Sequence, residues 1–174
     1  MIKKILWSNI FIIIAVLLQS TLFSRLLLFF HISAIPDLAL CILVFSSYTN
    51  GMMTGQLTGF FSGFFIDFLS SAPLGLNVFT RTLTGALAGL LRGNLMLDTV
   101  ILPAGLCAGA TVFKALLLIA LNFLFAGAVP AYSWTTPTLW IEILLNALLA
   151  PFLFDFLKKF DTLLVKIGGY DENR

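Results

Sequence analysis

The sequence predicts an all-α polytopic membrane protein with six transmembrane helices. Of its 174 residues, 60% are hydrophobic and only 10% are charged, whereas a soluble domain carries about 25% charged residues. Apolar stretches follow one another along the chain, and the gaps between them are short. We therefore expect a single integral membrane domain over residues 1–174, with no room for a soluble catalytic domain.

A helix that crosses the hydrocarbon core needs about 20 mostly apolar residues. The predicted spans cover residues 5–28, 35–49, 51–69, 74–91, 97–126 and 138–157. The first has an apolar run too long for a signal peptide, so we expect it to be retained. The second is short, and five spans would result if it formed a re-entrant pair with the third. Pro103 predicts a kink in the fifth.

The basic residues predict the orientation of the chain. With six spans, seven of them fall on one side of the membrane: Lys3, Lys4, Arg92, Lys158, Lys159, Lys166 and Arg174. The opposite side holds only Arg25, together with His31. Because cytoplasmic loops carry the excess of Lys and Arg, both termini are expected in the cytoplasm. The expected location is the bacterial cytoplasmic (inner) membrane, which the family resemblance described below implies.

Glycine recurs every fourth residue at the start of the third span, at Gly51, Gly55, Gly59 and Gly63. Residues four apart lie on one helix face, so these glycines predict a groove that lets another helix approach closely. The neighbour is either the second or fourth span of this chain or a helix of a partner protein. The opposite face carries phenylalanines that would point to lipid or to a neighbouring helix.

Four charged residues fall within the spans, namely Asp67, Arg81, Lys114 and Glu142, and their formal charges cancel. Charges at membrane depth are costly, so this balance predicts mutual pairing and marks a candidate site. Counting the helical rise per residue puts several polar residues in the outer half of the membrane, where they are predicted to form a polar cluster or a partner or ligand surface. Its predicted members are Asp37, Asp67, Asn77, Arg81, Glu142 and Asn146.

Within this cluster, Asp67 and Arg81 are predicted to form an ion pair between the third and fourth spans. A hydrated cavity or a polar partner surface is the main alternative, and a proton relay is a third. Lys114 is either a counter-ion or a side chain that snorkels to the interface. Helix breaks are predicted at Pro36, Pro73, Gly75 and Pro151.

No motif for catalysis, cofactor or metal binding stands out. Cys41 and Cys107 both fall in apolar runs without metal-ligand spacing, and His31 is the only histidine. We expect no enzyme activity, no cofactor, no metal site and no nucleic-acid partner. Membrane lipid is the expected surrounding.

Three segments carry a family resemblance: "IPDLAL" from Ile35, "GFFIDFLSSAPLGLNVFTR" from Gly63 and "EILLNALLAPFLF" from Glu142. Together they resemble the rod shape-determining protein MreD family. The resemblance implies a fold like that of the substrate-binding subunits of energy-coupling-factor vitamin transporters. It also implies a non-catalytic role in bacterial cell elongation. The implied partner is the membrane-anchored periplasmic protein MreC, and the more distant partners are MreB, RodA and the elongation-specific penicillin-binding protein.

On this resemblance, the expected function is a scaffold that helps to organise lateral peptidoglycan synthesis and rod shape. The alternative is a solute-binding subunit of an energy-coupling-factor vitamin transporter, and a small channel is a third possibility. Those transporter subunits dock their coupling protein through small residues on the first helix. The first span here is bulky, with Ala15 isolated, which favours the scaffold.

Overall fold

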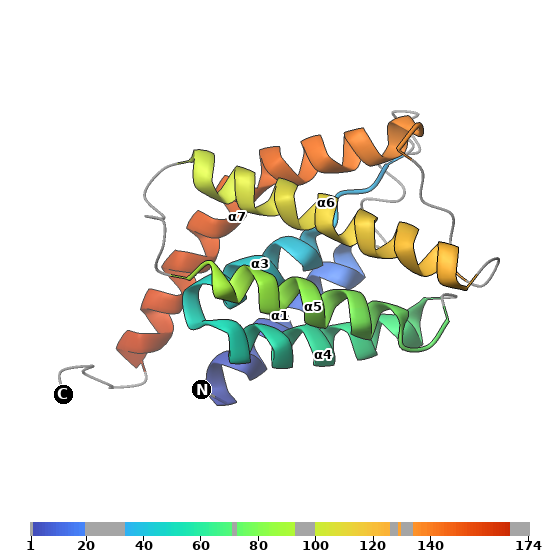
Figure 1. The fold of residues 1–174 in the computed structure, drawn as a ribbon. Coiled ribbons are helices and arrows are strands. Elements are labelled where there is room, and N and C mark those ends of the chain that lie inside the picture. The colour runs from blue at the N-terminus through green and yellow to red at the C-terminus, as the bar shows by residue number, and fades with distance from the viewer. Residues whose placement is uncertain are drawn as a thin grey trace.

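A computed structural model describes residues 2–19, 34–70, 73–92, 100–125, 129 and 134–167, and in these residues all regular structure is helical (Figure 1). The helices are α1 (Ile2–Leu18), α3 (Leu38–Asn50), α4 (Met52–Leu69), α5 (Leu76–Leu90), α6 (Ile101–Leu124) and α7 (Pro137–Ile167). The predicted all-α class is confirmed for this part of the chain. Residues 20–28 of the predicted first span, and also Arg25 and His31, lie outside it.

Two of the described helices are long and apolar enough to cross a membrane: α6, and α7 over Pro137–Phe160. In α1 and α3 the apolar stretches, Ile5–Leu18 and Leu38–Asn50, are shorter. The count of six transmembrane spans therefore stays a prediction.

Helix α3 is the centre of the molecule. Every residue from Ala39 to Tyr48 is buried, and α3 contacts each of the other five described helices. Its second half carries Ser46 and Ser47, whose hydroxyl groups are buried and hydrogen-bonded, and such polar groups favour a position inside the bundle over one facing lipid. Its 13 residues span only about 20 Å, less than the hydrocarbon thickness of about 30 Å. Ala34, Pro36 and Asp37 before it are buried but not helical, although Ile35 is exposed, so α3 begins inside the bundle.

Helices α4 and α5 lie side by side (Figure 1), and their backbones come into direct contact at three glycines of α4. A Cβ atom built on Gly55, Gly59 or Gly63 would lie within 2.5 Å of an α5 backbone oxygen. On α5, Gly85 lies against Gly55, and Gly89 lies against Gly51 and Met52; neither was among the predicted packing residues. The glycine face of α4 is thus occupied by another helix of the same chain. The phenylalanines opposite, Phe60, Phe61, Phe64, Phe65 and Phe68, are exposed.

Gly51 was predicted to belong to that face, but it lies outside α4 and joins it to α3. Its φ angle of +94° favours glycine, and its N–H donates to the carbonyl of Ser47. A Cβ atom there would meet the side chain of Arg92. Gly51 is therefore a turn residue.

The turn between α4 and α5 contains Pro73 and then Gly75, whose φ angle is also +94°. Pro36 stands just before the N-cap residue Asp37 of α3. These three predicted helix breaks lie between helices in the structure. Pro103, by contrast, lies in the first turn of α6, where its missing N–H has no intrahelical partner to lose. The predicted kink within that helix was therefore misplaced.

Pro151 was predicted to break the last helix, yet it lies inside α7, which continues to Ile167. Proline removes one helical hydrogen bond, which bends a helix without ending it when packing holds both sides. Figure 1 shows that α7 changes direction along its length and that its second half turns away from α6. The second half reaches α1, where Phe11 packs edge-on against Phe156 and Phe160.

Candidate functional site

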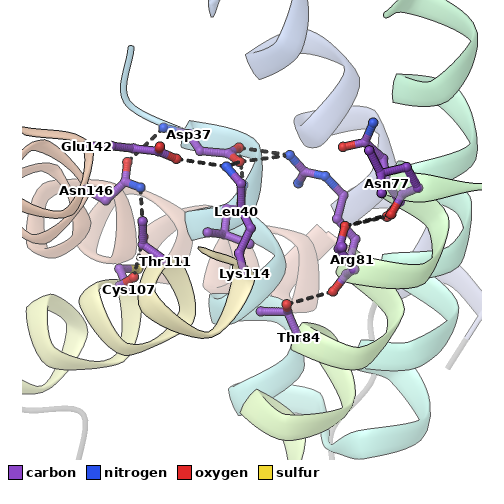
Figure 2. Close-up of polar contacts among 12 residues, drawn as sticks. Asp37, Leu40, Asn77, Arg81, Thr84, Cys107, Thr111, Lys114, Glu142 and Asn146 are labelled. Carbon is purple, nitrogen blue, oxygen red and sulfur yellow. Dashed lines mark hydrogen bonds and ion pairs between the residues drawn. The ribbon is translucent and has the colours of Figure 1, made fainter. Parts of the chain in front are cut away.

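Four charged side chains from four segments form one continuous chain inside the bundle (Figure 2). Arg81 of α5 donates from Nη2 to Asp37 Oδ1 at 2.9 Å and to Oδ2 at 3.1 Å. Lys114 of α6 donates from Nζ to Asp37 Oδ2 at 2.9 Å and to Glu142 Oε1 of α7 at 2.8 Å. Cations and anions alternate, so the formal charge of the chain is zero. We call these four residues the charge chain.

The charge chain is largely shielded from solvent. The side chains of Asp37 and Arg81 are each 8% exposed and that of Glu142 is 7% exposed, while Lys114 reaches 21%. Buried charges are tolerated only when partners and hydrogen bonds compensate the lost hydration. Nη1 of Arg81 is buried and has no partner among the described residues, so Arg81 relies on Asp37 for this compensation.

Further hydrogen bonds hold Asp37 in place. Its backbone N–H donates to Asn146 Oδ1 at 2.8 Å, and its carboxylate caps α3 by accepting from the N–H of Leu40 at 3.0 Å. Asn146 in turn donates to Thr111 Oγ1 at 2.9 Å. The start of α3 is thus bound to α6 and α7 by a neutral network beside the ionic one.

The predicted ion pair between Asp67 and Arg81 is wrong. Asp67 Oδ1 accepts from the backbone N–H and the side-chain amide of Asn77, and Oδ2 accepts from the N–H groups of Gly75 and Val78. The first N–H groups of a helix have no intrahelical partner and attract negative charge. Asp67, at the end of α4, therefore accepts hydrogen bonds from the free N–H groups at the N-terminus of α5. These bonds compensate its negative charge without a cation.

The structure consequently divides the predicted polar cluster in two. Asp67 and Asn77 form the helix-end site, whereas the other predicted members, Asp37, Arg81, Glu142 and Asn146, belong to the charge chain and its network. The role of Lys114 was left open by its sequence position, and in the structure Lys114 bridges two carboxylates. Thr111 was not predicted as a member, although Thr111 and Lys114 are three residues apart and so lie on one face of α6.

The charge chain is arranged to hold helices together. Each carboxylate faces a cation, and within the described residues no three His, Cys, Asp or Glu side chains gather closely enough to hold a metal ion. Cys41 and Cys107 are buried free thiols. Asp37, at the start of the central helix, links α5 on one side to α6 and α7 on the other.

Comparison with known proteins identifies the family of this chain. The model of the rod shape-determining protein MreD family matches residues 1–160. The chain belongs to the MreD family. The resemblance seen in the sequence is confirmed, and the matched region contains the whole charge chain. No curated protein matches the chain. No solved structure matches it either.

Membership makes this chain a rod shape-determining membrane protein. The two long apolar helices α6 and α7 agree with a membrane location. In an MreD-family protein, the charge chain is thus a polar core that must be held in a lipid environment. Charged groups inside a membrane protein carry a high free-energy cost, so their presence indicates a structural or functional requirement.

Proposed function

We propose that this MreD-family chain is a non-catalytic scaffold subunit of the bacterial elongation complex. It sits in the cytoplasmic membrane as a single domain of six spans, with both termini in the cytoplasm. It binds the membrane-anchored periplasmic protein MreC. Through MreC it works with MreB, RodA and the elongation-specific penicillin-binding protein in lateral peptidoglycan synthesis, which maintains rod shape.

The observation that carries this proposal is the internal pairing of the charge chain. Its carboxylates and cations bind one another across four segments and are mostly buried, so they support a firmly held body. A solute-binding subunit would instead use such groups to line an outward-opening cavity. A firmly held membrane body with apolar outer faces suits a protein that acts by binding other membrane helices.

The test is affinity recovery of the tagged chain from its native membrane in mild detergent, followed by mass spectrometry. We expect MreC and components of the peptidoglycan synthase to be recovered with it. Recovery of an ATPase pair and a coupling protein instead would identify a transporter subunit. A mock purification from cells with the untagged chain controls for non-specific capture.

A further inference from the structure

Two polar atoms that the charge chain does not involve are buried without a hydrogen-bond partner among the described residues. They are Oδ1 of Asn9 in α1 and Oγ1 of Thr58 in α4. Asn9 is 8% exposed and Thr58 is 0% exposed. A buried amide or hydroxyl group that lacks a partner destabilises the fold, so such groups are almost always paired with protein or with ordered water.

Thr58 faces the place where α1, α3 and α4 meet. These three helices contact one another (Figure 1). The glycine face of α4 packs on α5, and Gly59 belongs to it. Thr58 lies about 100° round the helix from Gly59. Because its side chain is fully buried, it points toward α1 and α3.

Asn9 faces the same place from α1. Trp7 and Phe11 pack against Phe160 of α7. Asn9 lies about 200° round the helix from Trp7, so it points away from α7. Its Nδ2 donates to the carbonyl of Ile5 at 2.8 Å, which leaves Oδ1 as the free acceptor.

The two side chains also lie at similar heights in the bundle. Oγ of Ser8 and Oγ of Ser46 are 2.8 Å apart and hydrogen-bonded, which fixes α1 against α3. Gly55 of α4 packs against the next residue of α3. Asn9 is one residue beyond Ser8, and Thr58 is three residues beyond Gly55. Along the helix axes they are therefore within about 6 Å of each other.

The geometry points to a water-binding site between α1 and α4, in which one buried water molecule donates to Asn9 Oδ1 and hydrogen-bonds Thr58 Oγ1. These two atoms do not bond to each other directly, since each lacks a partner. Water both donates and accepts, and it connects polar atoms that are too far apart for a direct bond. It is also small enough to lie among buried side chains. The site would add a polar link between α1 and α4, and such links hold helices together in lipid.

The first test measures the thermal midpoint of the full chain in mild detergent. Thr58→Val replaces the hydroxyl with a methyl group of nearly the same shape. Without a bound water, this change removes an unpartnered polar atom, so the midpoint should stay the same or rise. With a bound water, the change removes one of its partners, and we expect the midpoint to fall by at least about 3 °C.

Thr84→Val is the matched control. Thr84 is also buried, but its hydroxyl donates to the carbonyl of Thr80 in its own helix. We expect its midpoint to change by less than about 1 °C. A Thr58→Val midpoint at or above that of the wild-type chain would overturn the site.

The second test asks whether the two side chains hold the same water. Asn9→Leu removes the other partner and should also lower the midpoint. Because one water is lost in either variant, the double variant should lose clearly less than the sum of the two single losses. Full additivity would contradict a shared water.

A high-resolution density map of the wild-type chain gives a readout that does not depend on any variant folding. Density for a water within hydrogen-bond distance of both Asn9 Oδ1 and Thr58 Oγ1 supports the site. A map in which the two side chains bond directly, or in which protein atoms fill the space between them, overturns it.

Discussion

At the scale of single residues, the sequence showed that the buried charges balance but not which of them meet. Asp37 precedes a helix, and such a residue usually caps it at the surface. Here Asp37 does cap α3, and it also lies inside the bundle, because α3 is short and Ala34 and Pro36 before it are buried. The shortness of the predicted second span was the available signal that Asp37 lies below the surface.

The pairing in the structure changes the expected coupling between mutations. In a double-mutant cycle on unfolding in detergent, Asp37→Asn and Arg81→Gln should show a coupling energy of about 1–3 kcal/mol, because each residue compensates the other. Asp67→Asn with Arg81→Gln should be additive within about 0.5 kcal/mol, because these two side chains share no partner. Strong coupling in the second cycle and none in the first would contradict the charge chain.

Asp67 should matter for stability on its own account. It accepts four hydrogen bonds at the start of α5, and Asp67→Ala would leave these donors without their acceptor. We expect a loss of at least about 2 kcal/mol in the free energy of unfolding, measured by chemical denaturation in mixed micelles. Asp155→Asn is the control and should change it by less than about 0.5 kcal/mol, because Asp155 is exposed. A tolerated Asp67→Ala would show that water satisfies this helix end instead.

At the scale of helices, the glycine repeat indicated a face for close packing, and the structure shows α5 against it. The repeat can be recognised in the sequence because it depends only on the period of one helix. The helix that packs against it cannot be recognised, because Gly85 and Gly89 of α5 meet α4 only at one axial register of the two helices. The same limit applies to Gly105 and Gly109 of α6, which have a similar spacing but no atom within 4 Å of a built Cβ.

These two sets of glycines give a matched comparison. A Cβ atom at Gly59 would lie 2.4 Å from the carbonyl oxygen of Arg81, and backbone atoms have little freedom to move aside. Gly59→Ala should therefore lower the thermal midpoint in detergent. Gly105→Ala has open space and should raise stability by about 0.5–1 kcal/mol through the higher helix propensity of alanine. Gly59→Leu and Gly63→Leu should disrupt the protein more strongly, whereas exposed Phe60→Leu should not.

An unchanged thermal midpoint for Gly59→Ala would mean that α4 and α5 are not in close backbone contact. A loss of stability in Gly105→Ala as large as in Gly59→Ala would mean that α6 is also tightly covered at this face.

At the scale of the whole molecule, hydrophobicity alone located the helical segments. It could not show that α3 lies at the centre, or that α7 changes direction along its length and reaches α1. Both depend on contacts between segments far apart in the chain, such as Phe45 with Phe154, whose rings lie 5.1 Å apart. Local patterns of apolar residues carry no information on such pairs. The charge chain is of the same kind, since Asp37 and Lys114 are distant in sequence.

The orientation in the membrane is the prediction that belongs to this scale. Single cysteines can be introduced after both natural thiols, which are buried, are changed to serine. In intact spheroplasts, a membrane-impermeant maleimide should label Ser70→Cys and Thr136→Cys. It should label Arg92→Cys and Lys159→Cys only after the membrane is opened, because the basic residues favour the cytoplasmic side. All four positions are exposed in the structure.

Met52→Cys, at the start of α4 beside the turn from α3, distinguishes a six-span topology from one in which α3 and α4 form a re-entrant pair. In the six-span topology this turn reaches the cytoplasm, so the cysteine should react once the membrane is opened. In a re-entrant pair it would lie in hydrocarbon, where the thiol rarely ionises and maleimide reacts with the thiolate, so it should stay unlabelled in both conditions. Labelling of Lys159→Cys in intact spheroplasts would show that the orientation is the opposite of the proposed one.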